Sequence, residues 1–330
     1  MRKRTWIKAA AALAASIAVP GIRAQTPASH YPARPIRMVV PYAAGGGLDA
    51  IARLVAQGMG EALGQTVIVD NRAGGGGVIG AETVARAAPD GYTVLMAGNP
   101  ELVIAQALTP QNVRYDVQKD FVPINLVSES INILFAHPSV TASLADILTG
   151  KAAVPGGVAV GTPGPGSPQH ITLEVLQASS KARIIHVPYK GAGPAVGDVM
   201  SGQVKFGLVG APPVLAGMKA GKLRGLAVTG SKRSALAPEL PTIEEATGVK
   251  GTENFSTWYG LLAPGNTPKE AVDALQSAVS STLARQDVRD KLAVMGTEVQ
   301  ALPPAAFTER IRTDVKRYDE VVRRFNIKVE

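Results

Sequence analysis

Short apolar runs alternate along the chain with longer segments in which apolar residues recur at helical spacing. A run at residues 36–42 precedes a helical pattern at 48–63, and a run at 66–71 precedes one at 78–88. Strands alternating with helices in this way predict βαβ units and parallel strand pairs. Further strands are expected at residues 92–97, 131–136, 158–160, 184–187, 204–209, 223–229 and 255–263, and further helices at 101–108, 143–149, 169–179, 195–201, 269–285 and 305–324.

The order of these elements predicts an α/β fold with two lobes, each a mixed, mostly parallel sheet flanked by helices. No low-complexity linker divides the chain, so the lobes must be joined by crossing segments, expected near residues 126–130 and 254–259. We expect residues 25–128 and 257–330 to form lobe 1, and residues 129–256 to form lobe 2. Lobes hinged in this way close around a ligand at the carboxyl ends of their strands.

The first 24 residues have the pattern of a secretory signal peptide. Arg2, Lys3, Arg4 and Lys8 precede a short alanine-rich apolar run, and Ala24 ends a plausible cleavage site. The apolar run is too short for a membrane anchor, which needs about 18 apolar residues or more. The mature protein is therefore expected outside the cytoplasm, in the periplasm.

Charge and cysteine content narrow the function classes. Of 34 Lys and Arg residues, five precede the cleavage point and no acidic residue does, so the mature chain has 29 basic against 26 acidic residues, or +3. A net charge this small does not indicate a protein that binds nucleic acid. The chain has no cysteine, which excludes disulfides, thiolate metal sites and cysteine nucleophiles.

Four of the expected strands run directly into glycine-rich turns that precede helices. Backbone N–H groups at the start of a helix have no partner within the helix, and the helix dipole there favours negative charge. The pattern therefore predicts that the turns hold a small anion through main-chain amides. The turns contain Gly45, Gly46 and Gly47; Gly74 to Gly77; Gly164 and Gly166; and Gly191 and Gly193.

The side chains beside these turns suggest how each is used. Tyr42 can supply an apolar wall and a hydroxyl, and Asp49 can cap the helix after the first turn. Thr162 offers a hydroxyl, and Ser167 is a candidate N-cap. Pro194 suits the first turn of a helix, where its missing N–H costs nothing.

Other functions find less support in the sequence. Gly75, Gly77 and Gly80 match a dinucleotide fingerprint, but the next strand lacks the acidic residue that would bind a ribose. An exported enzyme using this turn is thus a weaker alternative. The histidines (His30, His137, His170 and His186) lack metal-ligand spacing, and no nucleophile elbow, zinc-protease motif or Walker A motif occurs. We expect no metal, no cofactor and no enzymatic activity.

Several motifs occur in an order that resembles one family. They are YPARPIRMVVPY at residues 31–42 with Gly45, Gly46 and Asp49; NRAGGGGVIG at 71–80; PDGYT at 89–93; HVPYKG at 186–191; and GKLRGLAVT at 221–229. Together they resemble the substrate-binding receptors of tripartite tricarboxylate transporters, also called the Bug family. The resemblance covers residue 31 to the C-terminus.

The resemblance implies a type II-like periplasmic binding protein that closes around a small carboxylated ligand and delivers it to membrane transporter subunits. Delivery receptors usually act singly, so a monomer is expected. A ligand-sensing subunit that signals to a membrane sensor kinase is the alternative, because it would close in the same way. The resemblance also implies that a set of residues grips or selects the ligand: Tyr42, Gly45, Gly46, Asp49, Thr162, Gly164, Gly166 and Ser167, with Gly193, Pro194 and Ala195 on the second-lobe wall and Asn99 near the distal end.

Overall fold

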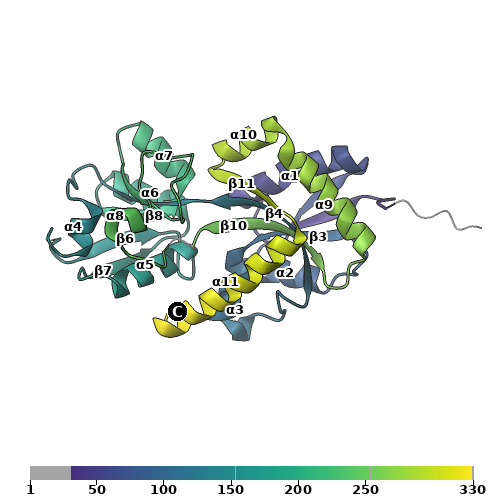
Figure 1. Ribbon diagram of the computed structural model, residues 1–330, viewed down its shortest axis with the longest axis horizontal. Coiled ribbons are helices and arrows are strands. Elements are labelled where there is room, and N and C mark those ends of the chain that lie inside the picture. Colours follow the sequence, from purple (N-terminus) through teal and green to yellow (C-terminus); the bar gives the residue numbers. More distant parts are fainter. Residues whose placement is uncertain (1–30, 153, 253–254, 329–330) are drawn as a thin grey trace, which may run out of the picture. The chain divides into compact units, whose positions relative to one another are not determined.

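The computed structural model describes residues 31–152, 154–252 and 255–328. The expected signal peptide lies outside these residues. Among them, no helix is long and apolar enough to cross a membrane. The described chain contains two sheets, each covered by helices (Figure 1).

The first sheet combines strands from the beginning and the end of the chain. Its strands, in spatial order, are β11 (Thr297–Leu302), β4 (Phe121–Ser130), β10 (Thr257–Pro264), β3 (Thr93–Gly98), β1 (Ile36–Val40) and β2 (Val67–Asn71). The pairs β1/β2 and β1/β3 are parallel, whereas β10 runs antiparallel to β3 and β4, and β11 antiparallel to β4.

The second sheet is built from the middle of the chain. Its strands, in spatial order, are β7 (Ile184–Pro188), β6 (Val158–Thr162), β8 (Phe206–Gly210), β5 (Asn132–Ala136) and β9 (Arg224–Val228). Here β6 is parallel to β7 and β8, and β5 is antiparallel to β8 and β9. The expectation of two mixed sheets flanked by helices is confirmed.

Helices cover both faces of each sheet because strand residues alternate between the faces. Met38 packs with α1 and α9, whereas the adjacent Val39 packs on the opposite face with α2 and α11. In the second sheet, Leu134 faces α4, α5 and α8, and Phe135 faces α6 and α7. The helices are α1 (Gly47–Leu63), α2 (Val78–Ala85), α3 (Ala105–Leu108), α4 (Leu144–Leu148), α5 (Pro168–Ala178), α6 (Ala192–Met200), α7 (Ala211–Lys219), α8 (Ile243–Thr247), α9 (Lys269–Ala284), α10 (Gln286–Val294) and α11 (Pro304–Arg324), with short turns η1 (Gly75–Gly77), η2 (Pro100–Ile104, a π-helix) and η3 (Pro110–Asn112).

Two segments carry the chain between the sheets. The chain leaves the first sheet at the end of β4 and, after one intervening residue, enters the second at β5, and it returns at β10. Figure 1 shows β4 and β10 side by side, and they pair along their whole length. The crossings lie close to the segments expected from the sequence, while the lobe boundaries themselves stay a prediction.

Candidate functional site

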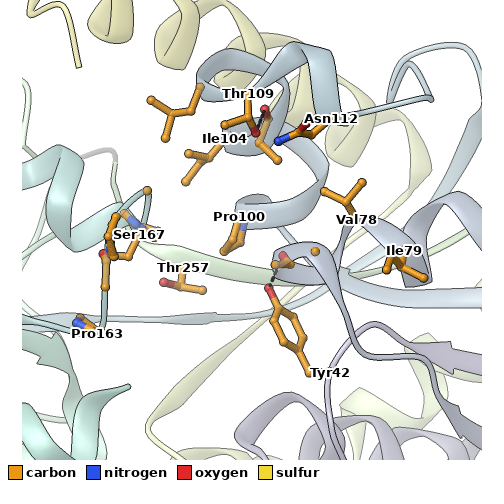
Figure 2. A pocket seen from close by; sticks show the side chains of 18 of the residues that line it. Tyr42, Val78, Ile79, Pro100, Ile104, Thr109, Asn112, Pro163, Ser167 and Thr257 are labelled. Atoms are coloured by element: carbon orange, nitrogen blue, oxygen red, sulfur yellow. Dashed lines mark hydrogen bonds between the residues drawn. The ribbon is translucent and has the colours of Figure 1, made fainter. Parts of the chain in front are cut away.

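A cavity of about 1000 Å³ is lined by loops from both sheets. The first sheet contributes Tyr42, η1, the start of α2 and the segment around η2 and α3, and the second sheet contributes the loop after β6. Figure 2 shows Tyr42 and Pro163 on one side of this cleft and Thr109 and Asn112 on the other. The lining residues are Tyr42, Gly75, Gly76, Val78, Ile79, Glu82, Pro100, Ile104, Ala105, Leu108, Thr109, Gln111, Asn112, Arg114, Pro163, Gly164, Pro165, Gly166, Ser167, Pro168, Gln169 and Thr257.

Tyr42 is held in the cleft wall by a buried carboxyl group. Its hydroxyl donates to Glu101 Oε2 at 2.7 Å, and Glu101 Oε1 accepts from the Gly98 amide at 2.6 Å. Glu101 is fully buried on the π-helical turn η2, and within the described segments no cation forms an ion pair with it. Burial raises the pKa of Glu101 to about 7, because the charged form loses its hydration. Glu101 therefore positions the Tyr42 ring from behind the wall.

The glycine turn after β2 also lines the cleft. Gly75 and Gly76 have φ of 58° and 65°, a left-handed conformation that glycine adopts without strain. At Gly77, an added Cβ would lie 2.9 Å from the Cβ of Glu101, so only glycine allows this close packing. The first amides of a helix have no partner inside it. The Gly77 amide donates to the Gly74 carbonyl at 3.0 Å, so the amides of Gly75 and Gly76 are the ones placed to donate to an anion in the cleft.

The glycine turn after β1 lies beside the cleft rather than in its lining. Asp49 is 4 % exposed, and its carboxylate accepts from the Gly45 amide at 2.9 Å, from Asn71 Nδ2 at 2.9 Å and from Arg53 Nε at 3.0 Å. The hydrogen bond from Arg53 leads the interactions that lower the pKa of Asp49 to about 2. Asp49 lies three residues after the N-cap Gly46 and ties the turn to β2 through Asn71. Gly45, Gly46 and Asp49 thus form a structural unit next to Tyr42.

In the second sheet, the loop after β6 enters the cleft with its hydrogen bonds largely satisfied. Ser167 caps α5 by accepting from the His170 amide at 3.2 Å, as its position predicts, and it donates to the Gly164 carbonyl at 2.8 Å. The Gly166 amide donates to His170 Nδ1 at 3.1 Å, and the Gly164 amide donates to Thr162 Oγ1 at 3.3 Å. The loop amides that the sequence suggests for a ligand therefore already have partners in this structure.

A pair of stacked histidines supports this loop from behind. The His170 and His186 rings lie 4.1 Å apart, and His186 Nε2 is 2.6 Å from Thr162 Oγ1. Because His170 Nδ1 accepts a hydrogen bond, its proton is assigned to Nε2, which lies 3.4 Å from Glu174 Oε1. Burial, followed by the proximity of His170, lowers the pKa of His186 to about 4. His186 is therefore neutral at neutral pH and serves the loop as a hydrogen-bonding group.

The remaining predicted site residues lie away from the cleft lining. Asn99 is 1 % exposed and donates to the Ser256 carbonyl and the Tyr318 hydroxyl, so it ties the end of β3 to the crossing segment before β10. Thr162 is fully buried beneath the loop after β6. Gly193, Pro194 and Ala195 form the first turn of α6, where Ala195 is buried in the core.

Sequence reasoning missed one whole side of the cleft. Its residues come from the first turns of α2, from η2 and α3, and from the loop after η3. In the sequence these residues occupy ordinary helix and loop positions, and no motif marks them as ligand-binding. The one available signal is that Val78 and Ile79 directly follow the glycine turn. The missed residues include Val78, Ile79, Ile104, Leu108 and Arg114. Among the described residues, no group of three or more histidine or acidic side chains could hold a metal ion.

Comparison with known proteins identifies the family. A family model described as "Tripartite tricarboxylate transporter family receptor" matches residues 51–327. The protein BugT of Bordetella pertussis is 35% identical over 318 residues, which cover 95% of this chain and 96% of BugT. The fold matches the solved structures of MatC from Rhodopseudomonas palustris with bound malate (30% identity, TM-score 0.72, covering 88% of this chain and 100% of MatC) and of R. palustris Rpa4515 with adipate (31% identity, TM-score 0.77, covering 90% and 99%). The resemblance noted in the sequence is therefore confirmed, and this chain belongs to the tripartite tricarboxylate transporter family of receptors.

Proposed function

We propose that this protein is a periplasmic solute-binding receptor that closes around a small carboxylate and delivers it to a membrane transporter of the tripartite tricarboxylate type. Family membership supports this role, and so do the relatives solved with malate and adipate. The signal-peptide pattern of the first 24 residues supports the periplasmic location. Binding requires no catalytic group.

The observation that carries the proposal is the meeting of loops from two sheets in one cleft. The amides of Gly75 and Gly76 approach it from the first sheet beside the Tyr42 ring, and the loop that contains Ser167 approaches it from the second. A hydrogen bond to a charged group contributes roughly 1.5–3 kcal/mol. A few such bonds, with the dipole of the 11-residue helix α5 behind Ser167, would hold a carboxylate without a dedicated cation next to it.

A buried hydrogen-bonded chain connects the cleft to both crossing segments. Gln169, in the cleft lining, donates from Nε2 to Asn132 Oδ1 at 2.6 Å, and Asn132 Nδ2 donates to the Phe255 carbonyl at 3.2 Å. Asn132 begins β5 directly after the first crossing, and Phe255 precedes β10 on the second. A ligand that moves the start of α5 would therefore act directly on the two segments about which closure takes place.

A matched pair of glycine variants tests the site. Gly76 in the cleft and Gly221 outside it have φ of 65° and 68°, and an added Cβ meets nothing within 4 Å at either position. Gly76→Val and Gly221→Val should therefore cost similar backbone strain, about 1–2 kcal/mol each. Only Gly76→Val should weaken acid binding, by about tenfold or more, because its side chain occupies ligand space.

The readout is a thermal-shift screen of malate, adipate, citrate and benzoate, followed by calorimetry on the acids that bind. Ligands that bind only the native state raise its melting temperature. If none of a wider set of mono-, di- and tricarboxylates shifts the melting temperature, the receptor function is wrong. Equal acid affinity in the two glycine variants would remove the cleft from the site.

A further inference from the structure

One wall of the cleft is apolar and partly open to solvent. Val78 and Ile79 of α2 face the cleft together with Ile104, Ala105 and Leu108 of η2 and α3. Ile79 is 53% exposed, although large aliphatic side chains are usually buried. Apolar surface left open inside a cleft is typical of a ligand contact. This wall therefore favours a ligand with an apolar body.

Beyond this wall, one cationic side chain occurs among the described residues that line the cleft. Arg114 follows η3 in the chain and is exposed, and within residues 31–152, 154–252 and 255–328 no carboxylate forms an ion pair with it. The acidic side chain that lines the same cleft, Glu82, is already paired with Arg86. The charge of Arg114 is thus available to a second anionic group, and its planar guanidinium suits bidentate binding of a carboxylate.

The positions of these groups set the shape of the ligand. Figure 2 places Tyr42 and Pro163 at one side of the cleft, Pro100 and Ile104 between, and Thr109 and Asn112 at the far side. Arg114 comes two residues after Asn112 in the chain. An acid of two or three carbons at the glycine turns would leave most of the roughly 1000 Å³ to water.

We propose that Arg114 is a specificity-determining residue of this cleft, and that the preferred ligand is an elongated acid with an apolar middle and a second anionic group at its far end. The first carboxylate lies at the glycine turns, the apolar middle covers the wall around Ile79, and the second anionic group binds Arg114. This inference rests on the proposed function, because it extends the same site to the far end of the ligand.

Calorimetry with paired acids of equal chain length tests the role of Arg114. The probes are succinate, adipate and suberate, compared with butyrate, hexanoate and octanoate. For the longer chains, the diacid should bind about tenfold more tightly than the matching monoacid, a ratio that corresponds to one charge-assisted contact. Arg114→Gln should reduce this ratio to about one, while Arg289→Gln, at an exposed arginine of α10 outside the cleft, should leave it unchanged.

A second pair of variants tests the apolar wall. Ile79→Ser in the cleft and Ile68→Ser on β2 replace side chains of nearly equal exposure, 53% and 52%. Ile79→Ser should weaken binding of adipate and suberate by about fivefold while leaving succinate nearly unchanged, and Ile68→Ser should affect none of them.

The outcomes separate this inference from the proposed function. If monoacids and diacids of equal length bind equally well, or if Arg114→Gln preserves the preference for diacids, the assignment of Arg114 is wrong and the receptor function stands. If no acid of either series, nor any acid in the earlier screen, binds the wild-type protein, the receptor function and the assignment both fall. A preference for diacids that weakens steeply with added salt agrees with an exposed contact at the far end.

Discussion

The glycine turn after β1 and the glycine loop after β6 share a local pattern but are anchored by different chemistry. In the first sheet, the anchors are carboxyl groups: Asp49 holds the Gly45 amide, and Glu101 holds Tyr42. In the second sheet, the anchors are a hydroxyl and an imidazole: Ser167 caps α5, and His170 accepts from the Gly166 amide. Among these turns, the loop after β6 lines the cleft directly, whereas Gly45 and Asp49 do not.

The difference between the anchoring groups of the two turns agrees with the negative charge of the proposed acidic ligand. An ionised carboxylate beside an acidic ligand would repel it, so anchors other than carboxylates suit the loop that lines the cleft. Asp49 is compensated by Arg53 and stands outside the lining. Glu101 is nearer, but burial favours its uncharged form. We therefore expect a glycine-rich turn between a strand and a helix to bind an acidic ligand only where the groups that anchor the turn do not repel the ligand's negative charge.

The largest expected effect concerns the pH dependence that Glu101 confers on stability. Its pKa rises from 4.5 when unfolded to about 7 when folded, so between these pH values the unfolded chain loses a proton that the native state keeps. Stability should therefore fall as the pH rises through this window, by about 3 kcal/mol in total. Glu101→Gln, which keeps a neutral partner for Tyr42, should abolish this fall.

Urea unfolding at about pH 5 and about pH 8 measures this effect. Glu270→Gln, at an exposed carboxylate of α9, is the control and should keep the slope of the wild type. A slope that survives in Glu101→Gln would mean that the slope does not arise from Glu101, and the argument that the carboxyl group nearest the cleft is uncharged would lose its main support.

A smaller effect is expected from Asp49→Ala. The change leaves the Gly45 amide without its acceptor and removes one of the two hydrogen bonds that Asn71 Nδ2 donates, which should cost about 2 kcal/mol of unfolding free energy. This contribution should be present above about pH 4 and disappear as the pH falls toward 2, because the folded-state pKa of Asp49 is lowered to about 2. Acid affinity should stay within about twofold of the wild type, since Asp49 is not a cleft residue.

The control for Asp49 is Asp273→Ala, which removes an exposed ion pair with Lys269 and should cost no more than about 0.5 kcal/mol. Chemical unfolding and calorimetry on the same samples separate stability from binding. A tenfold loss of acid affinity in Asp49→Ala, at a pH where the variant is fully folded, would place the turn after β1 in the site.

The smallest expected change in stability comes from Ser167→Ala. Loss of this N-cap should cost about 1 kcal/mol, as should Ser143→Ala at the equivalent cap of α4. The two variants should differ in binding: Ser167 lines the cleft, so only its loss should weaken acid affinity, by several-fold. Equal affinities in the two variants would show that the loop after β6 supports the cleft without contacting the ligand.

The regular elements could be predicted where one face of the element is buried. β1 was expected at residues 36–42 and spans Ile36–Val40, and α11 was expected at residues 305–324 and spans Pro304–Arg324. By contrast, α10 and β11 were missed because α10 buries only Val288 and Leu292, and β11 is an edge strand with polar residues. Their patterns contain too few apolar positions to be recognised.

β4 was only partly predicted, as a crossing segment near residues 126–130. Its first half contains Pro123 and Asn125, which argue against a central strand. In the structure β4 lies between β11 and β10, and the pairing with β10 is irregular near Pro123, where the register shifts. The irregularity accommodates a proline that removes one strand donor, an adjustment that depends on the partner strand and not on local sequence.

The residues of the candidate site also divide into those that the sequence predicts and those that it does not. Tyr42, Gly164, Gly166 and Ser167 follow strands directly and line the cleft, so their place can be inferred from the rule that strand ends meet at one edge. The place of Arg114 depends on how η2, α3 and η3 fold across the end of β3, which no local pattern specifies. Whether these residues contact a ligand stays a prediction for the variants above.

The interleaving of the two sheets has a consequence for synthesis. All strands of the second sheet lie between Asn132 and Val228, so this sheet can form while the last third of the chain is still missing. The first sheet cannot, because β10 stands between β4 and β3 and emerges about a hundred and thirty residues after β4. Until then β4 has no neighbour on either side and β3 has one only, so a nascent chain stalled before residue 257 would present the unpaired edges of both strands to chaperones or to aggregation.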